Sequence, residues 1–273
     1  MTLQNFIDIY HNSSKRSIVV YLVLRILTIF CMVRELMLKN YNNAFLCVVT
    51  LVLFAIPFFV KDTLAISLPS GLEIIIFCFI FAADILGEIN NFYGQFRLWD
   101  TMLHTLNGFL AASVGFSLVD LLNTRVRNFQ LAPVFVAIVA FCFSMTVGVT
   151  WEFMEFSADT FFKTDAQKDR IVRDIYSIEL NPNRANTPVA VRGIDHTVLY
   201  DADGNVLMTV EGGYLDIGLI DTMKDLIVNM IGAVVFSVFG YLYIADRDRY
   251  KLAHSFQIER LKKPGGEEED PVG

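Results

Sequence analysis

The amino-acid sequence predicts an all-α polytopic membrane bundle of about six transmembrane helices, with a small extracytoplasmic insertion that contains a β-hairpin. Of its 273 residues, 54% are hydrophobic and 19% are charged, which lies outside the range of ordinary soluble domains. Several apolar runs are long enough to cross a hydrocarbon core of about 30 Å. One long polar connection, residues 163–220, separates the last two runs.

Six apolar runs define the expected helices. They cover residues 18–37, 44–60, 68–86, 103–122, 131–151 and 226–245. The first run is too long for the core of a signal peptide and no small-residue cleavage site follows it, so we expect it to remain as the first helix. The four cysteines lie far apart within the runs and are interpreted as buried apolar residues.

The distribution of Lys and Arg predicts that both termini are cytoplasmic. With this orientation eleven Lys and Arg residues fall in the inner segments and three in the short outer loops, as the positive-inside rule requires. We therefore expect a multi-pass protein of the plasma membrane. The expected segments are a cytoplasmic N-terminal segment (1–17), helices 1 to 5 (18–162), the insertion (163–220), helix 6 (221–245) and a mobile cytoplasmic tail (246–273).

The insertion is too long for a bare loop. Residues 196–211 alternate polar and apolar side chains around an Asp-Gly turn at residues 201–205, which predicts a β-hairpin. An EF-hand is not indicated, because the later ligands and the terminal Glu are missing. The net charge of −7 and the lack of a basic stripe argue against nucleic acid and leave membrane lipids as the expected partners.

Polar side chains gather at one end of three predicted helices. Asp100, His104 and Asn107 are spaced to share one face of the fourth helix. The fifth and sixth helices carry similar stripes, formed by Glu152, Glu155 and Asp159 and by Asp221, Asp225 and Asn229. With the expected orientation, all three stripes meet at the extracytoplasmic face. Ionisable groups at the edge of a bilayer are expensive to desolvate, so such a cluster is a candidate functional site.

This set of donors suits a hard or borderline divalent cation such as Mg²⁺, Mn²⁺ or Zn²⁺, whose identity the sequence does not specify. The five carboxylates would repel one another without a cation or shared protons, so they are the expected metal ligands: Glu152, Glu155, Asp159, Asp221 and Asp225. Asp100 and His104 are the candidate catalytic pair, because a carboxylate fixes the tautomer of an imidazole. His104 could equally be a further ligand. The alternative is a structural polar network that joins the helices.

Further polar residues extend the hypothesis. A substrate would contact polar side chains near the same face: Glu88, Asn91, Tyr93, Asn107 and Asn229. Asp84 lies one turn before Glu88 and could extend the site. Arg25, within the first span, is expected either to reach the cytoplasmic interface, to bind a lipid phosphate or to pair with a carboxylate.

The three polar stripes, with Gly232 and Ala233 after Asn229, resemble the YjdF-like family of uncharacterised bacterial membrane proteins over most of the chain. More distantly, the series Asp-His, Glu, Asp, Asn-Gly is similar to the VanZ-like family, which is linked to glycopeptide-antibiotic resistance. The second resemblance implies a role in the bacterial cell envelope. The insertion before the sixth helix is longer than the VanZ-like pattern.

Three functions are compatible with these patterns. The first is a metal-dependent hydrolase or transferase that acts at the outer leaflet on a lipid-linked or envelope substrate. The second is an ion- or proton-coupled transporter, against which the absence of an evident inverted repeat counts. The third is a non-catalytic envelope protein in which the cluster is structural.

Overall fold

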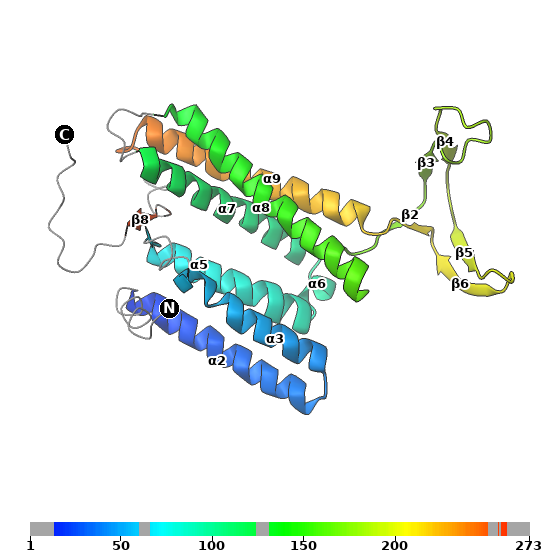
Figure 1. Cartoon of the computed structure of the whole chain (residues 1–273), viewed down its shortest axis with the longest axis horizontal. Coiled ribbons are helices and arrows are strands. Elements are labelled where there is room, and N and C mark those ends of the chain that lie inside the picture. The colour runs from blue at the N-terminus through cyan, green and yellow to red at the C-terminus, as the bar shows by residue number, and fades with distance from the viewer. Residues whose placement is uncertain (1–13, 60–65, 124–130, 251–255, 257, 261–273) are drawn as a thin grey trace. The chain divides into compact units, whose positions relative to one another are not determined.

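The computed structural model describes residues 14–59, 66–123, 131–250, 256 and 258–260 and confirms the predicted helical membrane fold (Figure 1). Within these residues, five helical segments are long and apolar enough to cross a membrane: α2 (Lys15–Met37), α3 (Tyr41–Leu53) with its extension to Phe59, α7 (Trp99–Asn123), α8 (Pro133–Phe162) and α9 (Leu219–Ala245). The third predicted span is formed by α5 (Ser70–Phe81), continued directly by the π-helix η1 (Ala82–Ile89). The short helix α6 (Phe92–Gln95) follows. The chain divides into two compact units, residues 1–147 with 228–273 and residues 148–227.

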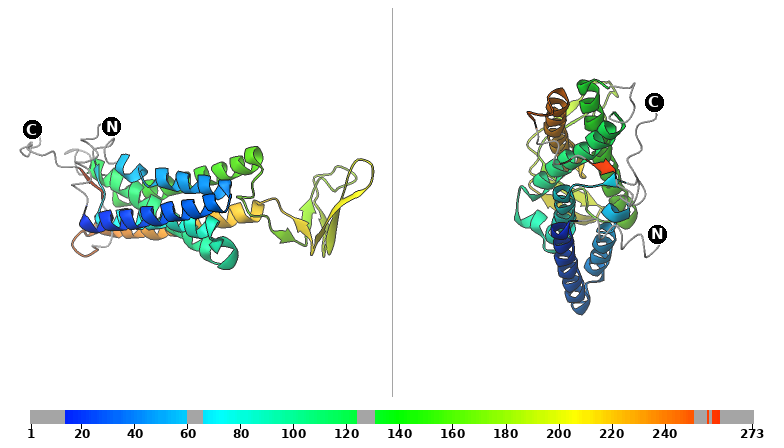
Figure 2. Two further views of the ribbon diagram at one scale, coloured as in Figure 1. Left: turned by 90° about the horizontal axis from the view of Figure 1, so that it is seen from below. Right: turned by 90° about the vertical axis from the view of Figure 1, so that its left-hand side faces the viewer.

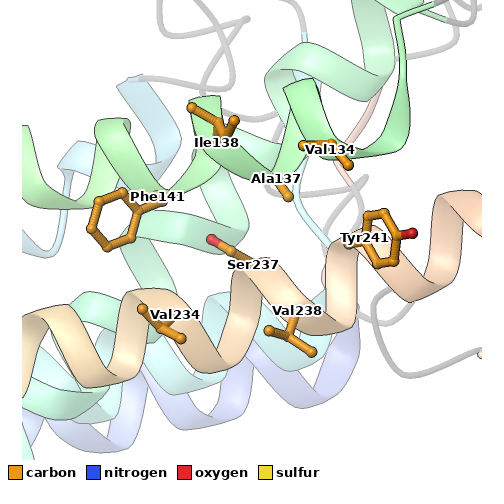
Figure 3. Close-up of a pocket in the computed structure, with 8 residues that line it drawn as sticks. All are labelled: Val134, Ala137, Ile138, Phe141, Val234, Ser237, Val238 and Tyr241. Atoms are coloured by element: carbon orange, nitrogen blue, oxygen red, sulfur yellow. The ribbon is translucent and has the colours of Figure 1, made fainter.

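In the first unit, α2 and α3 form a helical hairpin that packs against α5 (Figure 2). Helix α2 begins after Ser14, whose hydroxyl accepts a hydrogen bond from the backbone N–H of Ser17 at 3.2 Å and thereby satisfies one of the free donors of the first turn. Aromatic rings fill the space between the three helices: Tyr21, Phe54, Phe58 and Phe77, all buried. Their edge-to-face and stacked contacts fix how the hairpin sits on α5.

A second core of the same unit lies between α7, α8 and α9. It consists of small and aromatic residues that are almost fully buried: Ala112, Phe116, Val136, Ala140, Ala233, Phe236 and Tyr243. The backbones of α7 and α9 approach so closely that a Cβ atom added to Gly108 would lie 1.9 Å from the carbonyl oxygen of Asn229. The lack of a side chain at Gly108 therefore permits the close packing of α7 and α9.

Part of the segment predicted as a mobile tail lies against the helices in the structure. Ile258 is 2% exposed and packs against Leu72 and Leu110, and the backbone carbonyl of Phe256 accepts a hydrogen bond from the Ser117 hydroxyl at 2.9 Å. Strand β8 (Glu259–Arg260) pairs antiparallel with β1 (Ile66–Ser67). Phe and Ile within a charged segment supply apolar area, and burying that area favours docking over mobility. Residues 261–273 of the predicted tail lie outside the described part.

The second unit contains three antiparallel strand pairs (Figure 1). They are β2 (Ile171–Val172) with β7 (Tyr214–Leu215), β3 (Ile175–Ser177) with β4 (Val189–Val191), and β5 (His196–Tyr200) with β6 (Val206–Glu211). The last pair is the predicted hairpin. The Asp201 carboxylate accepts hydrogen bonds from the backbone N–H groups of Asp203 and Asn205, and Gly204 adopts a φ of +84°. The side-chain hydrogen bond from Asn205 and these backbone bonds lower the pKa of Asp201.

Candidate functional site

The first turns of α7 carry the His-carboxylate pair. Asp100 lies in the first turn, where a carboxylate interacts favourably with the helix dipole. His104 follows one turn later, and its Nε2 atom is 3.4 Å from Oδ1 of Asp100. The side chains of His104 and Asp100 are 14% and 22% exposed, so the pair is largely shielded yet reachable by water. The structure therefore brings together the two residues predicted as the catalytic pair.

One turn further along α7, a pair of amides joins three helices. Asn107 donates a hydrogen bond through Nδ2 to Oδ1 of Asn229 on α9 at 3.0 Å. Nδ2 of Asn229 in turn lies 3.5 Å from the carbonyl oxygen of Ser144 on α8, and the Ser144 hydroxyl donates to the carbonyl oxygen of Gly108 at 2.8 Å. Sequence reasoning assigned Asn107 and Asn229 to a substrate. In the structure their amide groups join α7, α8 and α9 to one another, and Asn229 is 1% exposed. A contact with a substrate stays a prediction.

The predicted metal ligands of the second unit have unequal surroundings. The Asp159 carboxylate accepts hydrogen bonds from the backbone N–H groups of Ala166 at 2.6 Å and Gln167 at 2.9 Å, and from the Thr164 hydroxyl at 2.7 Å. Both of its oxygens are engaged in holding the loop that follows α8. A carboxylate used in this way has little capacity left for a cation.

Asp221 has a similar role at the start of α9. Its Oδ2 atom accepts a hydrogen bond from the backbone N–H of Lys168 at 3.0 Å, and its Oδ1 atom forms an ion pair with the Arg170 guanidinium at 2.7 Å. Gln167 of the same loop donates to the Thr222 hydroxyl at 2.6 Å. The loop is thus tied to the start of α9 by charge and by hydrogen bonds.

The remaining acids of the set differ in burial. Glu152 on α8 and Asp225 on α9 are 5% and 2% exposed, and the Lys224 ammonium lies 3.4 Å from the Asp225 carboxylate. Glu155 accepts a hydrogen bond from the indole N–H of Trp151 at 2.7 Å and is only partly buried. Glu152 and Asp225 are thus more shielded from water than Glu155.

Sequence reasoning missed the basic partners of this acidic set. No role was predicted for Arg170 or Lys224, yet each contacts a predicted metal ligand. Lys224 directly precedes Asp225 in the sequence, which was a signal for that pair. The position of Arg170, 51 residues before Asp221, gave no such signal.

The predicted substrate-binding residues near α6 lie in the first unit. Glu88 and Asn91 are exposed, and Tyr93 is partly buried with its ring against Gly87. Asp84, four residues before Glu88, is 2.8 Å from the Thr50 hydroxyl on α3. Asp84 therefore faces the N-terminal hairpin through this contact.

A further acidic group of the second unit lies beside the loop. Burial raises the pKa of the Asp169 carboxyl above its ordinary value, and the nearby carboxylates of Asp165, Asp216 and Asp159 raise it further. Asp216 accepts hydrogen bonds from the backbone N–H groups of Arg170 and Ile220. These acids order the connection between the strands and α9.

Comparison with known proteins gives a family for the chain. A family model described as "Predicted membrane protein (DUF2238)" matches residues 17–246. An uncharacterized protein of Thermotoga maritima is 26% identical over 93 residues, which cover 34% of this chain and 46% of that relative, so the match spans about half of its length. No solved structure matches. Because the family model covers most of the sequence, from α2 to the residue after α9, the chain belongs to the DUF2238 family of predicted membrane proteins.

Proposed function

We propose that this integral membrane protein binds a divalent cation through His104, Asp100 and Asp225, with Glu152 as a further ligand, and uses it to hydrolyse or transfer a group of a lipid-linked envelope substrate. The observation that carries the proposal is the His104 and Asp100 pair at 3.4 Å, placed one turn from the hydrogen bond between Asn107 and Asn229. An imidazole with carboxylates is a donor set that borderline divalent cations accept.

Helix register supports the inclusion of Asp225. Helix α9 is continuous from Leu219 to Ala245, so Asp225 precedes Asn229 by about one turn, just as His104 precedes Asn107 on α7. The two helices run in the same direction, since Gly108 approaches Asn229 and Phe116 approaches Gly240 further along. Within their own helices, His104 and Asp225 therefore each lie about one turn before an amide of the pair.

Helix α8 runs in the opposite direction to α7. Ser144 is level with Gly108 through its hydrogen bond, and Glu152 lies eight residues later on the same helix. Eight residues rise about 12 Å along a helix. Glu152 is thereby proposed to complete the site from the third helix.

Each residue has a role in the proposal. The cation would polarise a carbonyl or phosphoryl oxygen of the substrate. Asp100 would orient the His104 ring and stabilise its protonated form, whether the imidazole acts as a base or as a ligand. Asp159 and Asp221 are assigned to the loop instead. The extracytoplasmic location rests on the Lys and Arg distribution, and the envelope substrate rests on the distant VanZ-like similarity.

Metal binding by the purified protein tests the proposal. Wild-type protein is stripped with a chelator and titrated with Mn²⁺, Zn²⁺ or Mg²⁺, followed by elemental analysis. His104→Gln and Asp225→Asn should each lower the affinity by about 10- to 100-fold, because each removes a ligand. The matched control, Asp159→Asn, should retain the cation while losing stability.

Three results would count against the proposal. Full metal content in both ligand variants would reject the cation site. Loss of metal in the Asp159 variant alone, at unchanged stability, would move the site to the loop. Solute flux driven by a proton or sodium gradient, without hydrolysis of any lipid-linked substrate, would favour a transporter in place of an enzyme.

A further inference from the structure

Arg25 is a charged residue in the middle of an otherwise apolar span. It is the eleventh residue of α2, and its side chain is exposed. The residues around it on the same side of the helix are exposed and apolar: Leu22, Ile26 and Ile29. A charged side chain on the outside of a membrane span is costly and marks a functional contact by default.

The guanidinium is held in place by a buried tyrosine. Arg25 donates a hydrogen bond through Nη1 to the hydroxyl of Tyr21, one turn toward the helix start, and its Cζ atom lies 5.7 Å from the centre of the Tyr21 ring. Tyr21 is 4% exposed and packs among the rings of Phe54, Phe58 and Phe77. Because the tyrosine is fixed by these contacts, the guanidinium has a defined position.

The group retains unused hydrogen-bond donors. A guanidinium carries five N–H groups, and within the described residues the Tyr21 hydroxyl accepts one of them. The described part of the chain gives Arg25 no carboxylate partner. In the hydrocarbon region, water cannot satisfy the remaining donors cheaply, so an acceptor from outside this part of the chain is required.

The position along the helix indicates where that acceptor comes from. The exposed residues Lys15 and Arg16 mark the polar start of α2. Tyr21, which holds the guanidinium of Arg25, lies six residues beyond Lys15. This corresponds to a depth of about 9 Å along the helix axis. A lipid head group drawn toward the protein at this end would meet Lys15 and Arg16 first and the guanidinium next. Charged residues within bilayers are known to cause such local thinning.

We propose that Arg25 and Tyr21 form a binding site for the phosphate group of a phospholipid in the leaflet at the start of α2. A guanidinium matches phosphate oxygens through two parallel hydrogen bonds, and every phospholipid of the leaflet supplies such a group. A carboxylate from a second copy of α2 or α3 is a poorer acceptor. The one acid on these two helices, Glu35, is 3% exposed and is already bound by Arg34 and Asn43.

Lipid binding by the full-length protein tests the site. Delipidated protein is titrated with phosphatidylglycerol in mixed micelles, and thermal unfolding and native mass spectrometry are followed. Arg25→Gln should weaken phosphatidylglycerol binding by about tenfold, because it removes charge-assisted hydrogen bonds. Arg25→Lys should weaken it less, since it keeps the charge and loses the paired geometry. Lys39→Gln, an exposed change just after the other end of α2, is the matched control and should retain the binding.

The source of the phosphate is distinguished by a parallel titration. Inorganic phosphate at the same concentration should give no stabilisation, whereas an equal effect would assign the site to free phosphate and overturn the lipid proposal. Equal lipid binding by wild type and Arg25→Gln would also overturn it. Cross-linking of residue 25 to an acidic residue of another protein, with unchanged lipid binding, would replace the lipid by a protein partner. If Arg25→Gln fails to fold, the decision rests on Tyr21→Phe, which removes the tether and should lower lipid binding severalfold.

Discussion

Replacing Gly108 by alanine should force α7 and α9 apart. The new Cβ atom would lie 1.9 Å from the carbonyl oxygen of Asn229, and ordinary contacts of this kind begin at 3.4 Å. The obstacle is backbone in the middle of a helix, so a rotamer change cannot relieve it and the helices must separate by more than 1 Å. Overpacking of this kind costs about 1 to 3 kcal/mol.

The separation also weakens the hydrogen bond between Asn107 and Asn229, now 3.0 Å long. Hydrogen bonds between membrane helices are worth on the order of 0.6 to 1.7 kcal/mol. We therefore expect Gly108→Ala to lower the free energy of unfolding by about 2 to 4 kcal/mol, measured by unfolding in mixed micelles with increasing SDS and followed by circular dichroism.

Gly71→Ala is the matched control for this substitution. A Cβ atom at Gly71 in α5 meets nothing within 4 Å, and alanine is the better helix former by up to about 1 kcal/mol. The control should be as stable as the wild type or slightly more stable. If Gly108→Ala unfolds at the same SDS fraction as the control, the close approach of α7 and α9 is wrong, and the register argument for Asp225 fails with it.

Three further substitutions test other parts of the chain. Burial and neighbouring acids raise the pKa of Asp169 in the folded state, so ionisation of Asp169 favours the unfolded state. The free energy of unfolding therefore falls as the pH rises from the pKa of Asp169 in the unfolded state to its pKa in the folded state. Asp169→Asn should therefore be more stable than wild type at pH 7 and equal to it at low pH. Thermal unfolding at both pH values checks this, and equal stability of the two proteins at pH 7 would contradict it. Asp120 is fully buried and 2.6 Å from Arg247. Because that guanidinium is 41% exposed and partly screened, Asp120→Asn should lower the free energy of unfolding by about 1 to 3 kcal/mol. A double-mutant cycle with Arg247→Gln should show a coupling energy between the two residues, and its absence would contradict the ion pair. Gly204→Cys should react with an impermeant thiol reagent in intact cells, and protection would reverse the predicted topology.

The sequence predicts the helices well because apolar length is a strong signal. The expected runs 18–37, 103–122 and 226–245 correspond to α2, α7 and α9. The run 68–86 forms a helix as predicted, but its type changes within the run. Apolar content cannot distinguish α-helical from π-helical hydrogen bonding, so the change from α5 to η1 at Ala82 was not predictable. The docked residues Phe256 and Ile258 were missed for a related reason, because two apolar residues among many charges form no recognisable period.

The roles of the acids could not be separated from spacing alone. Asp159, Asp221 and Asp225 all occupy regular positions on a helix face, and spacing reports the face without reporting the partners. The backbone partners of Asp159 and Asp221 are the N–H groups of residues 166–168, and no sequence pattern specifies where backbone N–H groups point. The predicted need for a cation to balance five carboxylates is reduced accordingly, since Arg170 and Lys224 already supply positive charge.

Polarity declines in the same order along α7 and α9, and this order locates the polar end of the bundle. On both helices charged or titratable side chains come first, amides about one turn later, and small and aromatic residues after them. The series is Asp100, His104, Asn107, Ala112 and Phe116 on α7. On α9 it is Asp221, Asp225, Asn229, Ala233 and Phe236. The cost of removing a group from water rises from apolar carbon to amide to charge, so such a gradient is stable only if the starts of both helices lie nearest to water. In the proposed cation site, a hydrated cation would therefore enter from the water-facing starts of the helices, and the amides of Asn107 and Asn229 would lie further from water.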